Sequence, residues 1–263
     1  MPMTLTEQSL GYAAQSVAGP VRAHNEDAVL CCPELGLWAV ADGMGGHACG
    51  EVASAMALQT LREVMAAGGV LDEAIHAANA AILAAGQQAG GRSMGTTVVA
   101  VSFAGSDFDL AWIGDSRAYR IGLGGIEQLT RDHSWVQAMI DAGELSVAEA
   151  RHHPRRNLVT QCLGQSELVL QVDRVQGSLA PGELLLLCSD GLTGELDDEQ
   201  IRQLCGSAAT LDELVEQLIG LAIQAGGKDN ISCIVLGRSV PESAEIDTRP
   251  RSFLSRLLNP RKH

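Results

Sequence analysis

Apolar residues follow two different spacings along the chain, and these predict strands in some segments and helices in others. Short apolar runs have the length and composition of buried strands. They lie at 28–32, 35–41, 96–103, 108–113, 117–121, 184–188 and 231–236. Apolar residues at helical intervals predict amphipathic helices over 51–65, about 71–89 and 211–225. The pattern therefore indicates a mixed helix and strand fold.

Two segments depart from this pattern. Residues 130–166 are polar and rich in His and Arg, with helical stretches but little strand signal, and we interpret them as a flap-like insertion beside the functional site. Beyond Pro241 the chain becomes polar and then basic, which predicts a flexible tail over 241–263. A short basic amphipathic helix that meets a membrane surface or a partner is the alternative for this tail.

Composition excludes several classes of protein. The 263 residues carry a formal net charge of -14, so binding to nucleic acid through its phosphates is not expected. The 7 cysteines are scattered without a CxxC pair, which argues against a disulfide framework or structural zinc and favours reduced thiols in the cytoplasm. Neither a signal peptide nor a transmembrane segment is evident, since the longest strongly apolar run is only Leu184–Cys188.

The candidate chemistry lies where apolar strands meet acidic turns. Such turns occur at Asp42-Gly43, Gly114-Asp115 and Asp190-Gly191, and a variant precedes a strand at Asp229-Asn230. Carboxylates that converge at one end of a sheet repel each other unless a cation lies between them. All-oxygen ligation suits Mg²⁺ or Mn²⁺ better than zinc. One Asp-Gly alone is usually a plain turn, so the whole set is needed for this prediction.

Eight sequence blocks, in this order, give the set its specificity. They lie at 21–27, 41–47, 94–97, 113–117, 129–134, 153–157, 187–192 and 228–231. With them the chain resembles the magnesium- or manganese-dependent protein phosphatases of the PP2C-like family, in their bacterial form. The resemblance implies a four-layer αββα sandwich of two mostly antiparallel sheets flanked by helices, formed by residues 1–240.

The resemblance also implies an activity. The chain would hydrolyse phosphoserine and phosphothreonine in proteins through a water activated by two Mn²⁺ or Mg²⁺ ions, with a third ion bound more weakly. Asp42 would bridge the two ions, the Gly43 carbonyl would bind one of them, and Asp190 and Asp229 would bind the other. Asp115, together with Asp190, would bind the third ion.

Other residues of the blocks would support this centre. The resemblance implies that Glu26 and Asp27 hold metal-bound waters, and that Arg22 grips the substrate phosphate. His47 is a candidate general acid, but Met44 occupies the place where animal members carry that histidine. His47 is therefore more simply interpreted as a residue that caps the following helix or orders the loop.

Three residues of the 130–166 segment are expected to have structural or surface roles rather than catalytic ones. His133 is expected to order the start of the segment rather than to act in catalysis. Arg156, beside Asn157, is expected to attach the segment to the core, whereas Arg151 is expected to be surface charge. The alternative is that these arginines meet an acidic or phosphorylated part of a substrate.

Within the family, the run 32–47 is most similar to phosphatases associated with type VI secretion. Those oppose a Ser/Thr kinase that acts on a forkhead-associated scaffold, so phosphorylated targets of such a kinase are the implied partners. Two other functions compete with this one: a catalytically weak regulator that binds phosphoproteins, and a sigma-factor regulatory phosphatase. The complete set of carboxylates argues against the first, and the presence of Arg22 argues against the second.

Overall fold

Two antiparallel sheets packed face to face form the centre of the molecule in the computed structural model, which describes residues 10–45, 49–90, 93–166 and 169–238. The first sheet has the order β1-β11-β10-β7-β8 and the second the order β2-β3-β5-β6-β9, with β4 paired to β3. The first contains β1 (Leu10–Val17), β7 (Arg117–Gly122), β8 (Gly125–Gln128), β10 (Leu184–Cys188) and β11 (Ile231–Arg238). The second contains β2 (Asp27–Cys32), β3 (Leu37–Met44), β4 (Gly95–Thr96), β5 (Val98–Ala104), β6 (Asp107–Ile113) and β9 (Asp173–Ser178).

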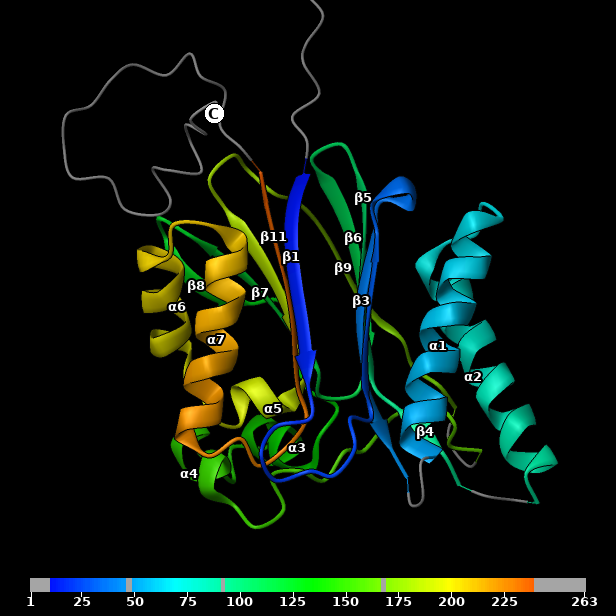
Figure 1. Cartoon of the computed structure of the whole chain (residues 1–263). Helices are drawn as coiled ribbons and strands as arrows, with labels where there is room; N and C mark the ends of the chain where they lie inside the picture. The colour runs from blue at the N-terminus through cyan, green and yellow to red at the C-terminus, as the bar shows by residue number, and fades with distance from the viewer. Residues whose placement is uncertain (1–9, 46–48, 91–92, 167–168, 239–263) are drawn as a thin grey trace, which may run out of the picture.

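Helices cover both outer faces of this sandwich (Figure 1). On the second sheet lie α1 (Cys49–Ala66) and α2 (Leu71–Gln88), and on the first lie α6 (Asp198–Ser207) and α7 (Leu211–Ala225). The remaining helices are η1 (Pro33–Leu35), α3 (Trp135–Asp141), α4 (Val147–His152) and α5 (Asp190–Thr193). The predicted four-layer αββα sandwich is therefore confirmed.

Three layers of apolar side chains hold the four layers of backbone together. Strand β10 shows the principle, because its run of leucines is buried on both faces. Leu185 and Leu187 point into the core between the sheets, whereas Leu184 and Leu186 pack towards α6 and α7. A strand that is apolar on both faces must lie inside such a sandwich, which is why its sequence shows no alternation.

Local signals fix several element boundaries. The Thr210 side chain accepts a hydrogen bond from the Glu213 amide at the start of α7, and Gly226 follows the last residue of that helix. The bounds predicted for this helix are confirmed. Pro33 begins a short 3-10 turn between β2 and β3, so the two predicted strands at 28–41 are also confirmed.

The structure contains elements that the sequence pattern did not predict, namely β1, β8, β9, α5 and α6. Residues 130–166 form the two short helices α3 and α4; an isolated bridge joins Ser134 to Val159 within the segment, and another joins Leu163 to Thr96 of β4. The predicted tail at 241–263 lies outside the described residues. Among helices in the described ranges, none combines the length and apolarity that a membrane crossing requires.

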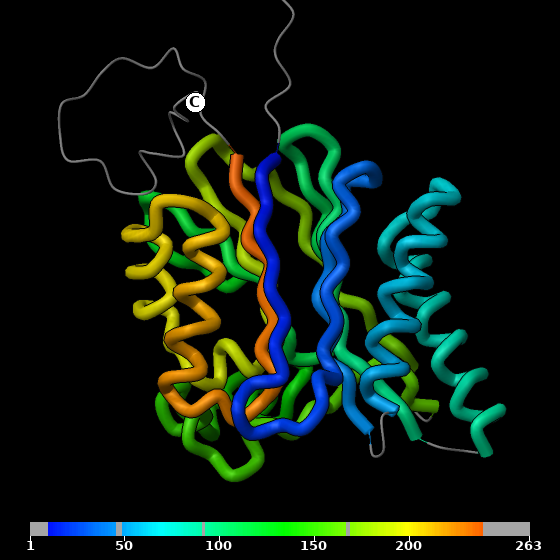
Figure 2. The backbone as a smooth tube through the Cα atoms, viewed as in Figure 1, coloured from blue at the N-terminus to red at the C-terminus, as the bar shows by residue number. Residues whose placement is uncertain are grey.

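One end of the sandwich gathers segments that are distant in the sequence. Figure 2 shows the loop after β1, the end of β3 and the connection from α7 to β11 at this end. Strands β1 and β11 lie side by side, with Val17 opposite Ile231, so the loop after β1 meets the turn before β11. The acidic turns predicted from the sequence therefore come together.

Candidate metal and phosphate site

Asp27 joins the two sheets at this end. It lies opposite Asp42 in the β2–β3 pair. Its Oδ2 accepts hydrogen bonds from the Ser189 hydroxyl at 2.8 Å and the Ser232 hydroxyl at 2.7 Å; Ser189 follows β10 and Ser232 lies in β11, both strands of the other sheet. Its Oδ1 is buried and has no hydrogen-bond partner among the described residues. A buried oxygen without a donor is costly, so this atom is suited to bind water or a cation.

The backbone of Asp42 is held by two threonines. The Asp42 carbonyl accepts bonds from the Thr97 amide and the Thr96 hydroxyl, both at 2.9 Å. The Asp42 amide donates to the Thr97 hydroxyl at 3.2 Å, and that hydroxyl lies 2.7 Å from the Ser116 hydroxyl. These bonds occupy the main chain of Asp42 and leave its carboxylate for the site.

Two glycines beside the acidic residues allow a very close approach of backbones. A Cβ on Gly43 would lie 2.2 Å from the Gly50 carbonyl oxygen, and one on Gly191 would lie 1.9 Å from the Asn230 oxygen. No side chain fits at either distance. The two Asp-Gly pairs are therefore required by packing as well as by the turn.

Burial, together with the charge of neighbouring carboxylates, raises the pKa of four carboxyl groups at this end. Burial raises the pKa of Asp27 to about 7, and the charges of Asp190 and Asp229 act in the same direction. Burial and neighbouring carboxylates also raise the pKa values of Asp42, Asp115 and Asp190. A hydrogen bond with the Asp42 side chain partly offsets the rise at Asp190. Negative charge is thus concentrated here beyond what the nearby arginines neutralise.

Arg22 and Asp229 form an ion pair at the rim of the acidic group. Arg22 Nη2 donates to Asp229 Oδ2 at 2.8 Å, and the Asn230 amide donates to Asp229 Oδ1 at 2.9 Å. The Asn230 side chain then holds the loop that carries Arg22. Its Oδ1 accepts from the Glu26 amide at 2.8 Å, and its Nδ2 donates to the His24 carbonyl at 2.8 Å.

Glu26 lies beside these carboxylates at the start of α1. Its main-chain oxygen accepts from the Gly43 amide at 3.1 Å and from the Ser54 hydroxyl at 2.6 Å. Its side chain packs against Gly50, where a Cβ would lie 2.7 Å from Oε1. A carboxylate in this place faces the positive end of the helix dipole.

The donors fit hard divalent cations. Every predicted ligand is an oxygen atom, the carboxylates repel one another, and the buried Oδ1 of Asp27 lacks a donor. Within the described ranges, no three Asp, Glu, His or Cys side chains already surround one point closely enough to hold an ion alone. Asp229, one of the predicted ligands, is paired with Arg22.

The structure brings together most of the predicted site residues. Asp42, Asp115 and Asp190 are coupled through their charges, and Asp27 and Asp229 adjoin them. His47 lies outside the described residues. The sequence analysis assigned no role to the residues that hold the acids in place, although all of them except Ser232 lie in the eight sequence blocks; they are Thr96, Thr97, Ser189, Asn230 and Ser232.

Two predictions concern arginines of the 130–166 segment. Arg151 is exposed, as expected for surface charge, and its Nη2 also donates to the Leu196 carbonyl at 2.9 Å, which attaches α4 to the segment after α5. The side chains of Arg156 and Asn157, which were expected to make such an attachment, are exposed. His133 does order the start of the segment, since its Nδ1 accepts from the Gly114 amide at 3.2 Å.

Known proteins are similar to this chain in sequence over most of its length. The family model of Protein phosphatase 2C matches residues 21–222. The serine/threonine protein phosphatase PstP of Mycobacterium tuberculosis is 39% identical over 236 residues. That match covers 86% of this chain but only 44% of PstP, so the chain spans less than half the length of this relative.

Solved structures share the fold. The crystal structure of Mycobacterium tuberculosis PstP superposes with a TM-score of 0.81 at 38% identity, covering 87% of this chain and 98% of that one. The PstP catalytic domain in complex with 2 manganese ions gives 0.78 at 36% identity, covering 87% and 98%. PppA, described as a key regulatory component of the type VI secretion system in Pseudomonas aeruginosa, gives 0.77 at 36%, covering 87% and 97%. This chain belongs to the protein phosphatase 2C family.

Proposed function

We propose that this chain is a metal-dependent phosphatase that hydrolyses phosphoserine and phosphothreonine in other proteins. One observation carries the proposal: Asp27, Asp42, Asp115 and Asp190 come from four separate segments and are buried together at one end of the sandwich, where burial and neighbouring carboxylates raise the pKa of each. Such a concentration of negative charge is costly for the fold and is explained by a cation-binding role. The names of the relatives support the reaction class.

Two Mn²⁺ or Mg²⁺ ions would be held by the oxygen atoms described above. Asp42 would contact both ions, the Gly43 carbonyl one of them, and Asp190 and Asp229 the other. Glu26 and Asp27 would accept hydrogen bonds from water at the edge of the site. Asp115, with Asp190, would hold a third and weaker ion. Manganese in the related PstP structure supports the choice of metal.

The bound cations, Arg22 and Asp42 would each have a separate role in phosphate hydrolysis. The cations, when bound, lower the pKa of water and stabilise negative charge on the phosphoryl group. Arg22 lies at the rim with half of its side chain exposed, so it can turn from Asp229 to two oxygens of a phosphate. The rigid backbone bonds of Asp42 keep its carboxylate in place while the substrate reacts.

The test is hydrolysis of a phosphoserine peptide with and without Mn²⁺. We expect chelation to abolish turnover, added Mn²⁺ to restore it, and Asp42→Asn to lose nearly all activity while circular dichroism shows an intact fold. Full turnover in excess chelator, with metal content checked, would exclude the metal mechanism. Binding of the phosphopeptide without turnover in Mn²⁺ would favour the alternative of a regulator that only binds phosphoproteins.

In the cell the chain would act in the cytoplasm against a Ser/Thr kinase. The likeness to PppA supports a role in type VI secretion, in which the substrate would be a phosphorylated forkhead-associated scaffold. The similarity to the serine/threonine protein phosphatase PstP supports phosphoserine and phosphothreonine as the groups that are hydrolysed. Deletion of the gene should increase phosphothreonine on the scaffold, measured by quantitative phosphoproteomics. An increase confined to anti-sigma-factor antagonists would favour the sigma-factor regulatory alternative.

A further inference from the structure

The turn Gly114–Arg117, which carries Asp115, is held by two consecutive residues at the start of the 130–166 segment. His133 binds its first residue twice. The His133 amide donates to the Gly114 carbonyl at 2.9 Å, and the Gly114 amide donates to His133 Nδ1 at 3.2 Å. The backbone of Gly114 is thus fixed on both sides by one histidine.

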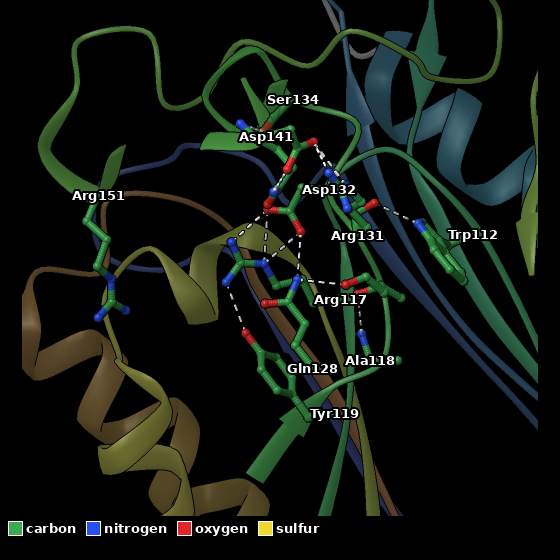
Figure 3. Close-up of polar contacts among 12 residues, drawn as sticks. Trp112, Arg117, Ala118, Tyr119, Gln128, Arg131, Asp132, Ser134, Asp141 and Arg151 are labelled. Carbon is green, nitrogen blue, oxygen red and sulfur yellow. Dashed lines mark hydrogen bonds and ion pairs between the residues drawn. The ribbon is translucent and has the colours of Figure 1, made fainter. Parts of the chain in front are cut away.

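Asp132 binds the last residue of the same turn. Arg117 Nε donates to Asp132 Oδ1 at 2.9 Å, and Arg117 Nη2 donates to Oδ2 at 2.6 Å. Arg117 Nη1 also donates to the Tyr119 hydroxyl at 3.0 Å, and Gln128 Nε2 donates to Asp132 Oδ1 at 3.0 Å. Figure 3 shows these four side chains joined in one network. Asp115 therefore lies between two anchored residues.

Both anchors are enclosed by protein. The exposed fractions of the Asp132 and His133 side chains are 8% and 10%, so neither offers a surface to a protein substrate. The bond from the Gly114 amide needs a lone pair on Nδ1. The neutral ring therefore carries its proton on Nε2, which faces Asp173 Oδ2 at 3.3 Å. The bonds define the tautomer and hold the ring in one orientation.

We infer that Asp132 and His133 are positioning residues that clamp the turn Gly114–Arg117 and so set the position of the Asp115 carboxylate. The inference rests on the proposed function for the claim that Asp115 binds a cation. Outer residues that orient a ligand change metal affinity without touching the metal. The clamp thereby makes cation binding at Asp115 depend on residues of the 130–166 segment.

The first test measures the clamp without any metal. Nitrogen-15 NMR of the full chain in chelator should show His133 with a bare Nδ1 and a protonated Nε2. His133→Gln moves the acceptor away from Gly114, and we expect the Gly114 amide to exchange with solvent at least about tenfold faster. His133→Asn places an acceptor near the former Nδ1, and exchange should stay within about threefold of the wild type.

The matched control is His76→Asn, on the exposed face of α2 and remote from this turn. This variant should leave the rate of hydrogen exchange at the Gly114 amide unchanged. A protonated Nδ1 in the wild type, or equal exchange in the Gln and Asn variants, would overturn the clamp. The tautomer measurement needs no variant, so it can overturn the clamp even if His133→Gln fails to fold.

The second test measures cation binding by titration calorimetry with Mn²⁺. His133→Gln should weaken the weakest site about tenfold, Asp132→Asn by a similar factor, and His133→Asn by threefold or less. Asp115→Asn should remove that site. If Asp115→Asn leaves Mn²⁺ binding unchanged, the proposed role of Asp115 is wrong and the cation part of the inference falls with it. If Asp115→Asn removes the site but His133→Gln leaves its affinity intact, the positioning role alone is overturned.

Discussion

Two arginine–aspartate pairs adjoin the acidic group, since the charges of both arginines act on Asp190, and the pairs differ in exposure and in number of bonds. Arg22 makes one bond to Asp229, and the two side chains are 51% and 29% exposed. Arg117 makes paired bonds to Asp132, at 26% and 8% exposure, and a further bond to Tyr119. An exposed single bond is weak and exchangeable, whereas an enclosed bidentate pair is costly to break. The first arginine is thus available for substrate, and the second belongs to the framework.

The largest effect should come from breaking the enclosed pair. Arg117→Ala leaves the Asp132 carboxylate buried without its counter-charge, which should lower the free energy of unfolding by about 3–5 kcal/mol. Urea denaturation followed by circular dichroism measures this loss. Arg120→Ala, which breaks the more exposed pair with Glu127, is the matched control and should cost less than about 1 kcal/mol. Equal losses of unfolding free energy in both variants would contradict a structural role for the enclosed Arg117–Asp132 pair.

A second effect concerns the carboxylates that adjoin the two pairs. Because the pKa of Asp27 rises to about 7 on folding, the folded chain keeps a proton between about pH 4 and pH 7 that the unfolded chain has lost. In chelator, the free energy of unfolding should therefore fall as the pH rises through this window, by about 2–4 kcal/mol from Asp27. Urea denaturation at several pH values measures the slope. Asp27→Asn should reduce it, since the raised pKa values of Asp42, Asp115 and Asp190 supply the remainder, and an unchanged slope in that variant would show that Asp27 is not among the groups responsible.

The smallest effect on the fold should come from the exposed pair, although its effect on the reaction is large. Arg22→Ala should raise KM for a phosphopeptide about tenfold, with a smaller fall in kcat, because a phosphate contact made in the ground state is mainly uniform binding. The free energy of unfolding should change by less than about 1 kcal/mol. Steady-state kinetics in saturating Mn²⁺ measures KM and kcat, with Arg202→Ala on α6 as a control. Unchanged KM and kcat would place Arg22 outside the reaction.

The sequence predicts which aspartates form the site better than it predicts which residues hold those aspartates in place. Asp42, Asp115 and Asp190 adjoin apolar segments whose strand character is strong, so their convergence follows once the strands form two sheets. Strand β1 is different, because Leu10–Val17 has small and polar residues and becomes a strand only through its pairing with β11. The hydroxyl groups of Ser189 and Ser232 likewise gain a role only when Asp27 arrives from the other sheet.

The bonds of Asp27 also set an order of events during synthesis. Its partner Ser232 belongs to β11, which lies 205 residues further along the chain and must insert between β1 and β10. Contacts of such long range form late, because closing the loop between them costs entropy before the contacts repay it. A chain still on the ribosome with β11 inside the exit tunnel therefore has an incomplete acidic group. The site can therefore form only after β11, the last strand of the described fold, has been synthesised and has paired with β1 and β10.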